Sequence, residues 1–341
     1  MKEKTTTGIP EYSHIPPERL VKRVKIISKI QGNMILSLAI IILSIFLSFK
    51  TEGFFTTYNL INVLRQISLT SLMAIGFGIV VITGGMDISM GNVAAMVGMT
   101  VAGLFAIMKV NLFVSLVISL ALGLGIGLLN GAVIAYLGVP PFIATLAMMF
   151  ISQGITFEFT QGYPIYEGLT SNFLYIGQGY IGPLPVPVII MIAMFILAHF
   201  FLNNTVLGQH IYSIGGNENA ARVTGVNVSR VKLITYGISG FFAALTGVVM
   251  TARLGSAQPA AAGMDFFLTA ATAAVLGGTE LSGGVGNMLG ILLGALFLGI
   301  LNNGLTLLKI SAYFQWIVTG ILLILAIVWH TTQKSASGGK Y

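Results

Sequence analysis

The chain contains no cysteine and very little charge. Because cysteine is absent from all 341 residues, disulfide bonds, thiolate chemistry and cysteine-ligated metals are excluded. Charged residues make up 8% of the chain, whereas soluble domains carry about 25%. Hydrophobic residues make up 55%, and there are 42 glycines. This composition excludes a soluble protein and indicates helices that pack closely in lipid.

Motifs for nucleotide binding and catalysis are also missing. No GxxxxGK[ST] sequence occurs, and the glycine-rich run GGVGNMLG lacks the lysine that would reach a phosphate. There is no HExxH motif and no visible pairing of a nucleophile with a base, and the four histidines are scattered: His14, His199, His210 and His330. An intramembrane enzyme is therefore disfavoured. We expect no catalytic residue, no bound cofactor and no metal site on this chain.

Positive charge is concentrated at the N-terminus. The net charge is +7, but seven of the 17 lysines and arginines lie between Lys2 and Lys29, before the first apolar run. This is the pattern of a cytoplasmic segment next to a membrane rather than of a nucleic-acid site. No signal peptide is evident, because the first apolar run begins only near Met34 and no small-residue cleavage site follows it. Residues 1–33 are predicted to be a basic cytoplasmic segment.

The rest of the chain reads as an all-α polytopic membrane protein. A straight crossing needs about 20 apolar residues. The sequence predicts a single membrane domain over residues 34–330 and a cytoplasmic tail over 331–341. The fifth and eighth predicted spans are short, which indicates broken or re-entrant segments. The ten predicted spans are 34–49, 67–83, 91–108, 112–137, 142–157, 185–202, 231–252, 265–277, 285–308 and 313–330.

Ten spans place both termini in the cytoplasm. Arg222, Arg230 and Lys232 then lie inside, and the long segment 158–184, which has no lysine or arginine, lies outside. That segment is either a plain surface loop or a partly structured outer rim that meets a partner. Five cations fall outside against the positive-inside rule: Lys50, Arg65, Lys109, Arg253 and Lys309.

Two pairs of motifs indicate a degenerate internal repeat. VITGGMDISMGN (81–92) resembles VLGGTELSGGVGN (275–287), and LLNGAVIAYLGVPPFI (128–143) resembles LNNGLTLLKISAYFQW (301–316). The first copy has about one more helix between its motifs than the second. Duplicated halves are common in transporters and tend to enclose a central path. The alternative is that glycine-rich membrane helices resemble one another by composition.

A polar loop, 203–230, interrupts the membrane domain and reads NNTVLGQHIYSIGGNENAARVTGVNVSR. Asn217 is a favourable N-cap, Glu218 suits a first turn, and Gly225 can close a helix in the left-handed conformation. Gly215 and Gly216 before them predict a tight turn. The loop is therefore expected to present a helix of about two turns at the membrane surface. Such a helix is too short to be stable alone. It either docks on a partner or is an ordinary interfacial helix.

Several motifs in series resemble the ribose-type permease family of ABC importers. They are TGGMDISMGN, GQHIYSIGGNENAARVTGVNV, KLITYGISGFFAALTGVVMTARLGSAQP and AAVLGGTELSGGVGN, and the similarity covers about residues 60–330 in matching order. The resemblance implies a coupling helix that docks on the ATPase, with Gly215, Gly216, Asn217, Glu218, Ala220, Ala221, Arg222, Thr224 and Gly225 as its residues.

The same resemblance implies the partners. They are a second permease chain, identical or a close paralogue, a cytoplasmic ATPase that binds ATP and magnesium, and an extracytoplasmic sugar-binding protein. The protein would lie in the bacterial inner membrane, where this chain forms the path for a monosaccharide or similar neutral polyol. Which sugar it carries does not follow from the sequence.

A second motif combines Gly84, Gly85, Asp87 and Ser89. The glycine pair permits a sharp turn or a close helix approach. Asp87 and Ser89 are expected to cap the helix that follows, and a direct contact with substrate is the alternative. The Gly-Gly-x-Asp-x-Ser pattern resembles the sugar permeases rather than the related branched-chain amino-acid permeases.

Polar side chains within the predicted spans are the candidates for lining the path. Neutral amides suit a neutral polyol because they both donate and accept hydrogen bonds. Structural bonding between helices is the alternative for each of them. Phe142 either faces a sugar or packs. The path candidates are Asn92, Asn130, Phe142, Gln153, Asn287 and Asn303, and Tyr236 and Asn302 are further polar residues within spans.

One stretch departs from the family pattern. Relatives usually carry two acids before Val-Leu-Gly-Gly, but here the residues 267–273 read FLTAATA, with Asp265 close and out of register and Thr269 as a possible substitute cap. Gln209 likewise stands where a basic residue is frequent. The competing function is a one-chain transporter driven by an ion gradient. That mechanism needs ionisable groups in mid-membrane, whereas Asp87, Asp265 and Glu280 map near span ends.

Overall fold

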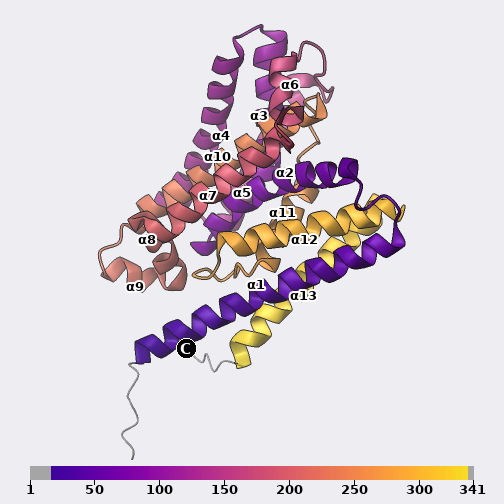
Figure 1. Cartoon of the computed structure of the whole chain (residues 1–341). Helices are drawn as coiled ribbons and strands as arrows, with labels where there is room; N and C mark the ends of the chain where they lie inside the picture. Colours follow the sequence, from indigo (N-terminus) through magenta and orange to yellow (C-terminus); the bar gives the residue numbers. More distant parts are fainter. Residues whose placement is uncertain (1–16, 337–341) are drawn as a thin grey trace, which may run out of the picture.

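The computed structural model describes residues 17–336, with side chains described for 32–329, 331 and 332. It is almost entirely helical (Figure 1). The long helices are α1 (Pro17–Lys50), α2 (Thr57–Ile82), α4 (Leu112–Tyr136), α5 (Pro141–Thr160), α7 (Val186–Asn204), α10 (Val228–Leu254), α12 (Met288–Leu307) and α13 (Ala312–Ala336). The shorter elements are α3 (Met90–Ala102), which continues into the π-helix η1 (Gly103–Ile107), then α6 (Ser171–Gln178), α8 (Val206–Gly216), α9 (Glu218–Val223) and α11 (Met264–Leu276).

Nine helices among the described residues are long and apolar enough to cross a membrane, and α11 is a tenth, shorter apolar helix. The prediction of a polytopic all-α fold is confirmed. The fifth predicted span is not broken, because α5 is continuous over 20 residues. The first predicted span agrees within two residues with the apolar part of α1, Gly32–Lys50, whereas the second was predicted too short, since α2 begins at Thr57. Residues 1–16 of the basic N-terminal segment and 337–341 of the tail lie outside the described residues.

Helices α6 and α9 lie at opposite ends of the molecule (Figure 1). The segment predicted as 158–184 is partly structured. It holds α6 and a small antiparallel pair, β1 (Tyr180–Ile181) with β2 (Leu184–Pro185). We refer to this end as the α6 end and to the other as the α9 end.

Helices α2, α3 and α10 form the core, and glycines let α10 pack closely against α4. Residue Gly240 of α10 meets Gly127 of α4 so closely that an added Cβ on Gly240 would stand 2.8 Å from the Cα of Gly127. Gly123 and Gly131 of α4 make similar backbone contacts with α10. Small residues allow this approach in membrane helices, where packing rather than the hydrophobic effect holds helices together.

The link before α11 enters the molecule instead of staying at its surface. Its residue Ala257 pairs with Ile165 and packs against the outer half of α3, whereas Gly263 lies against Gly91 at the first turn of α3. The link therefore runs along α3, and the 13-residue helix α11 begins beside the first turn of α3. Non-helical backbone is tolerated at membrane depth when protein covers it. The eighth span is short, as predicted, but α11 itself is a continuous helix, and the non-helical stretch lies before it.

Four of the five cations that the predicted orientation places outside share a structural position. Lys50 and Arg253 lie in the last turns of α1 and α10, and Lys109 and Lys309 follow the C-terminal ends of η1 and α12 with φ of 58° and 60°. Helix C-termini carry partial negative charge. Local helix ends therefore explain four of the five exceptions.

The two pairs of repeated motifs are not placed alike. The first pair meets at the α9 end, where the amide of Gly284 donates to the carbonyl of Ile82 at 2.8 Å. The second pair lies at opposite ends, because Asn130 bonds to Ser89 just after α2 ends, and Asn303 bonds to Asn59 near the start of α2. Two helices separate the motifs in the first copy and one in the second. The additional helix places the second motif on the opposite side.

Candidate functional site

Helix α9 is a short helix with well-formed ends. The side chain of Asn217 accepts from the amide of Ala220 at 3.0 Å, and Gly225 follows the helix with φ of +88°. The predicted N-cap and left-handed closure are thus both confirmed. The predicted turn at Gly215 and Gly216 is wrong, because both are the last residues of α8. The chain changes direction one residue later, at Asn217, whose backbone is extended.

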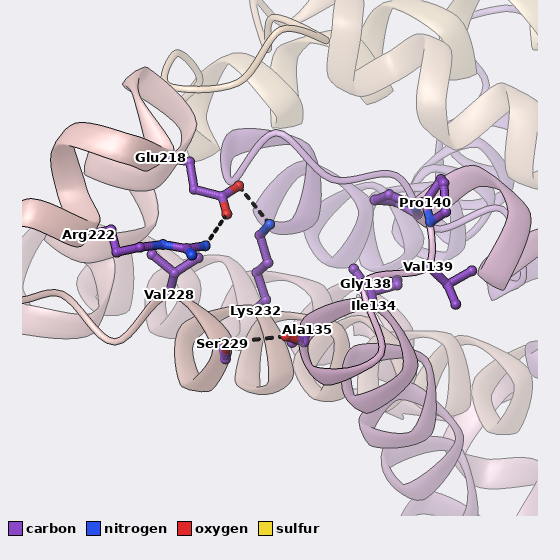
Figure 2. Close-up of a pocket in the computed structure, with 11 residues that line it drawn as sticks. Ile134, Ala135, Gly138, Val139, Pro140, Glu218, Arg222, Val228, Ser229 and Lys232 are labelled. Atoms are coloured by element: carbon purple, nitrogen blue, oxygen red, sulfur yellow. Dashed lines mark hydrogen bonds and ion pairs between the residues drawn. The ribbon is translucent and has the colours of Figure 1, made fainter.

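An ion cluster fixes α9 to α10 (Figure 2). Glu218 accepts from Lys232 of α10 at 2.7 Å and from Arg222 of α9 at 3.0 Å. The hydrogen bond from Lys232 is the largest cause that holds the pKa of Glu218 below its ordinary value, and Arg222 lowers it further. Sequence separation hid the Lys232 pair, because the two residues are 14 positions apart, whereas the pair with Arg222 follows helical i, i+4 spacing.

A pocket of about 240 Å³ opens beside this cluster, between α9, the start of α10 and the link from α4 to α5. Figure 2 shows Pro140, Val139 and Gly138 of that link facing Glu218 and Lys232 across it. The hydroxyl of Ser229 donates to the carbonyl of Ala135 at 3.2 Å and ties α10 to the end of α4. The pocket has both charged and apolar walls.

The outward face of α9 is not covered by the other residues that the structure describes. Ala221 is buried, whereas Val223 is 88% exposed, with Ala220 and Thr224 exposed beside it. The described residues thus leave an apolar side chain of α9 open to another molecule. Sequence reasoning missed Val223. Its signal was an apolar residue between Arg222 and Thr224, on the face opposite the buried Ala221.

The turn between α2 and α3 holds a buried carboxylate. Asp87 is 1% exposed, and one of its oxygens accepts from the amide and the hydroxyl of Ser89 at 3.1 and 2.6 Å. Its other oxygen accepts from the hydroxyl of Ser239 on α10 at 2.7 Å. The prediction that Asp87 and Ser89 cap α3 is wrong. Ser89 holds the cap position without a side-chain cap bond; its hydroxyl donates to Asp87, and its oxygen accepts from Asn130.

Two further contacts hold the same turn. Gly84 takes φ of +79°, and Gly85 leaves room for Tyr236, whose hydroxyl donates to the carbonyl of Met86 at 3.1 Å. The glycine pair thus gives the sharp turn and the close helix approach that the sequence predicts. Ser239 was not predicted, since a serine in a glycine-rich helix carries no signal of a partner 152 residues away.

Three of the predicted path residues bond within the protein. Asn130 is buried and donates to the hydroxyl of Ser89 at 3.0 Å. Asn287 caps α12 by accepting from Gly290 at 2.8 Å. Asn303 exchanges hydrogen bonds with Asn59 at 2.7 and 3.0 Å. These contacts support the structural alternative for all three residues.

The other three path candidates lie on α3 and α5. The amide of Asn92 donates to the carbonyl of Met149 at 3.1 Å and lies 3.5 Å from the side-chain oxygen of Gln153. Gln153 is exposed, and Phe142, in the first turn of α5, is 53% exposed. A polar amide exposed on a membrane span is unfavourable toward lipid. This face of α5 is therefore the best candidate for a path wall among the described spans.

Residues in the stretch that departs from the family pattern have structural contacts. Thr269 donates to the carbonyl of Asp265 inside α11 and does not cap it, since Gly263 holds the cap position. Phe267 is buried with its ring 5.3 Å from that of Phe77. Among residues 32–329, 331 and 332, no cluster of three acidic or histidine side chains could hold a metal ion.

At the α6 end the structure adds a cluster that sequence reasoning did not find. Arg65 donates to the carbonyl of Gln178 at 2.6 Å and lies 4.7 Å from the ring centre of Tyr180. Gln178 in turn donates to the carbonyl of Arg253 at 3.1 Å. The cluster ties the segment after α6 to both α2 and α10.

Nine long apolar helices among the described residues, with the short helix α9 and an exposed amide on α5, define a polytopic membrane protein. A family profile described as "Branched-chain amino acid transport system / permease component" matches residues 59–327, and the chain belongs to this permease family. It is a multi-pass inner-membrane protein and a transport component, not an enzyme.

Several proteins similar to this chain are named as permeases for sugars. The ribose import permease proteins of Escherichia coli strain K12 and Bacillus subtilis strain 168 are each 43% identical, over 85% of this chain and 91% and 90% of theirs. The D-allose transport system permease protein of Escherichia coli strain K12 is 35% identical, over 84% of this chain and 87% of its own. The resemblance to ribose-type permeases is confirmed. No solved structure matches the chain.

Proposed function

We propose that this chain is the membrane-spanning subunit of an ATP-binding-cassette importer, and that it forms the path for a monosaccharide or similar neutral polyol. The names of its relatives support the class of substrate. The observation that carries the proposal is α9, which the chain holds by the Glu218–Lys232 pair while leaving Val223 uncovered. A separate cytoplasmic ATPase, which binds ATP and magnesium, docks on this face.

The orientation follows from the same contact. If α9 meets a cytoplasmic ATPase, the α9 end is cytoplasmic and the α6 end is extracytoplasmic. Ten passes, with α11 as the shortest, then place both termini in the cytoplasm. The α6 end exposes four tyrosines, at 163, 166, 175 and 180, and such side chains are common in protein contacts. An extracytoplasmic sugar-binding protein delivers the substrate there.

A second permease chain completes the path. The α5 face that holds Gln153 and Phe142 is exposed in the single chain, although hydrocarbon disfavours an exposed amide. A second copy of this chain, or a close paralogue, covers that face, and the sugar passes between the two α5 helices. Neutral amides and an aromatic ring there suit a polyol, since they need no counterion.

The docking of α9 can be tested by charge placement. We expect Val223→Glu to abolish co-purification of the chain with its ATPase, because the new charge enters an apolar contact, while the spans stay folded. Lys109→Glu, at the α6 end, is the matched control and should co-purify normally. Full co-purification of Val223→Glu would contradict the assignment of α9.

A further inference from the structure

Three backbone segments meet at the α9 end without side chains between them. They are the last turn of α8 at Gly215, the turn after α2 at Ile82, and the link between α11 and α12 at Gly284. A Cβ on Gly215 would overlap the carbonyl oxygen of Ile82 and the amide nitrogen of Gly284. Those two atoms are themselves hydrogen bonded at 2.8 Å. We call Gly215, Ile82, Gly84, Gly283 and Gly284 the glycine junction.

Other contacts reinforce the junction. A Cβ on Gly283 would lie 2.8 Å from the nitrogen of Gly84 and 3.0 Å from the Cα of Gly215. In addition, the hydroxyl of Tyr212, one turn earlier on α8, donates to the carbonyl of Gly286 at 2.9 Å. Interiors packed this closely transmit displacement, because no flexible side chain can absorb it. The end of α8 therefore cannot shift without moving both links.

Helix α8 is joined to α9 through a single residue, Asn217, where the chain changes direction. The amide of Asn217 donates to the carbonyl of Ser213 at 3.1 Å, and Asn217 then caps α9. A displacement of α9 by a docked partner thus reaches the glycine junction through a single helix.

From the junction, contacts continue to the path candidates. The turn after α2 leads through Asp87 and Ser89 into α3, where Asn92 bonds to the carbonyl of Met149 on α5 and lies beside Gln153. The link on the other side leads to α11, whose end at Gly277 packs against Gly290 of α12. Both routes begin at Gly215.

We propose that Gly215 is a positioning residue that passes the movement of α9 to both links at once, so that the work of the ATPase reaches the path through the glycine junction. This inference rests on the proposed function. Contact alone does not establish coupling, which requires a change in transport for each ATP hydrolysed. The conformational preference of glycine does not explain Gly215, because it has no positive φ and alanine is the better helix former.

Gly215→Ala and Gly125→Ala form a matched pair. Both residues lie in helices, α8 and α4, but a Cβ on Gly125 meets nothing within 4 Å. Each variant is assembled with the ATPase and the binding protein in vesicles, and sugar uptake and ATP hydrolysis are measured together. We expect Gly125→Ala to match the wild type. Gly215→Ala should hydrolyse ATP, with sugar moved per ATP lowered by about tenfold, within the usual range of coupling.

The outcomes separate the two levels of the proposal. If an assembled Gly215→Ala variant takes up sugar as fast as the wild type and moves as much sugar per ATP, the role of the glycine junction is overturned, and the proposed function stands. Absence of ATP-driven uptake in the wild type overturns the proposed function as well. If Gly215→Ala does not assemble, the inference is tested with Tyr212→Phe. This variant removes only the hydroxyl that donates to the carbonyl of Gly286. Lowered sugar per ATP in that variant supports the inference, and an unchanged ratio overturns it.

Discussion

The hydroxyl of Ser239 donates to the carboxylate of Asp87 at 2.7 Å, and both side chains are buried, 0% and 1% exposed. This bond joins the turn after α2 to the middle of α10. The groups that donate to the carboxylate of Asp87 are two hydroxyls and a backbone amide. The turn that carries the glycine motif is therefore anchored by a polar network rather than by apolar packing alone.

Breaking this network should lower stability in a non-additive way. Asp87→Ala removes the acceptor of Ser239 and Ser89, and each buried donor left without a partner costs about 1–3 kcal/mol. Ser239→Ala and Asp87→Ala should each lower the apparent unfolding midpoint of the purified protein, and the double variant should lose less than their sum. Ser213→Ala, exposed on α8, is the control. Additive losses would show that the two residues act separately.

The pair of Asn303 and Asn59 is predicted to be structural. Asn303→Leu leaves the side-chain oxygen of Asn59 without the amide that donates to it, which costs about 1–3 kcal/mol. Replacing both by leucine removes the unpaired group and should recover most of the loss. Unfolding midpoints of the two single variants and the double variant measure this. A loss of sugar uptake in the single variant, with an unchanged midpoint, would return Asn303 to the path.

Close packing of α4 on α10 gives a second matched pair. A Cβ on Gly127 would overlap the carbonyl of Tyr236 and lie 3.0 Å from Gly240, whereas a Cβ on Gly125 meets nothing within 4 Å. Gly127→Val should therefore prevent folding or lower the yield in membranes severalfold, because the helices must separate. Gly125→Val should give a normal yield. Equal yields for the two variants would argue against this crossing.

The Glu218 cluster predicts a specific pH dependence. The folded pKa of Glu218 is held below its ordinary value of 4.5, so its stabilising effect is present above pH 4.5 and is lost as the pH falls through the lowered folded pKa. The side chain is 39% exposed, so after discounting for solvent the effect is at most about 1 kcal/mol.

Glu218→Gln should unfold at a lower midpoint than the wild type at neutral pH. The difference should shrink as the pH falls below 4.5. Unfolding curves for both proteins across pH 3–7, about the range in which carboxylates titrate, measure it. A difference that stays constant into acid would show that the ion pairs do not stabilise α9.

Local patterns in the sequence predicted the ends of α9 well, because Asn217 and Gly225 act on neighbouring backbone. The same approach failed for Gly215, whose partners Ile82 and Gly284 are distant in the sequence. From the sequence alone a glycine pair predicts a turn, because the backbone that it contacts is not known. The α9 boundaries were thus predictable, and the junction beside them was not.

Polar residues within the spans show the same limit. The sequence selected Asn130, Asn287 and Asn303 as candidates for the path. In the structure Asn130 bonds to Ser89, Asn287 caps α12 and Asn303 pairs with Asn59. Only exposure, which depends on the neighbouring helices, separates Gln153 from these residues. Composition alone predicted a membrane protein, and the short apolar run of the eighth span predicted the short helix α11.

The most direct test of the transport function uses vesicles that contain this chain, its ATPase and the sugar-loaded binding protein. We predict that sugar accumulates only when ATP and magnesium are supplied on the side of α9, and that the chain alone accumulates none under a proton or sodium gradient. Uptake by the chain alone, driven by an ion gradient without ATP, would contradict the account.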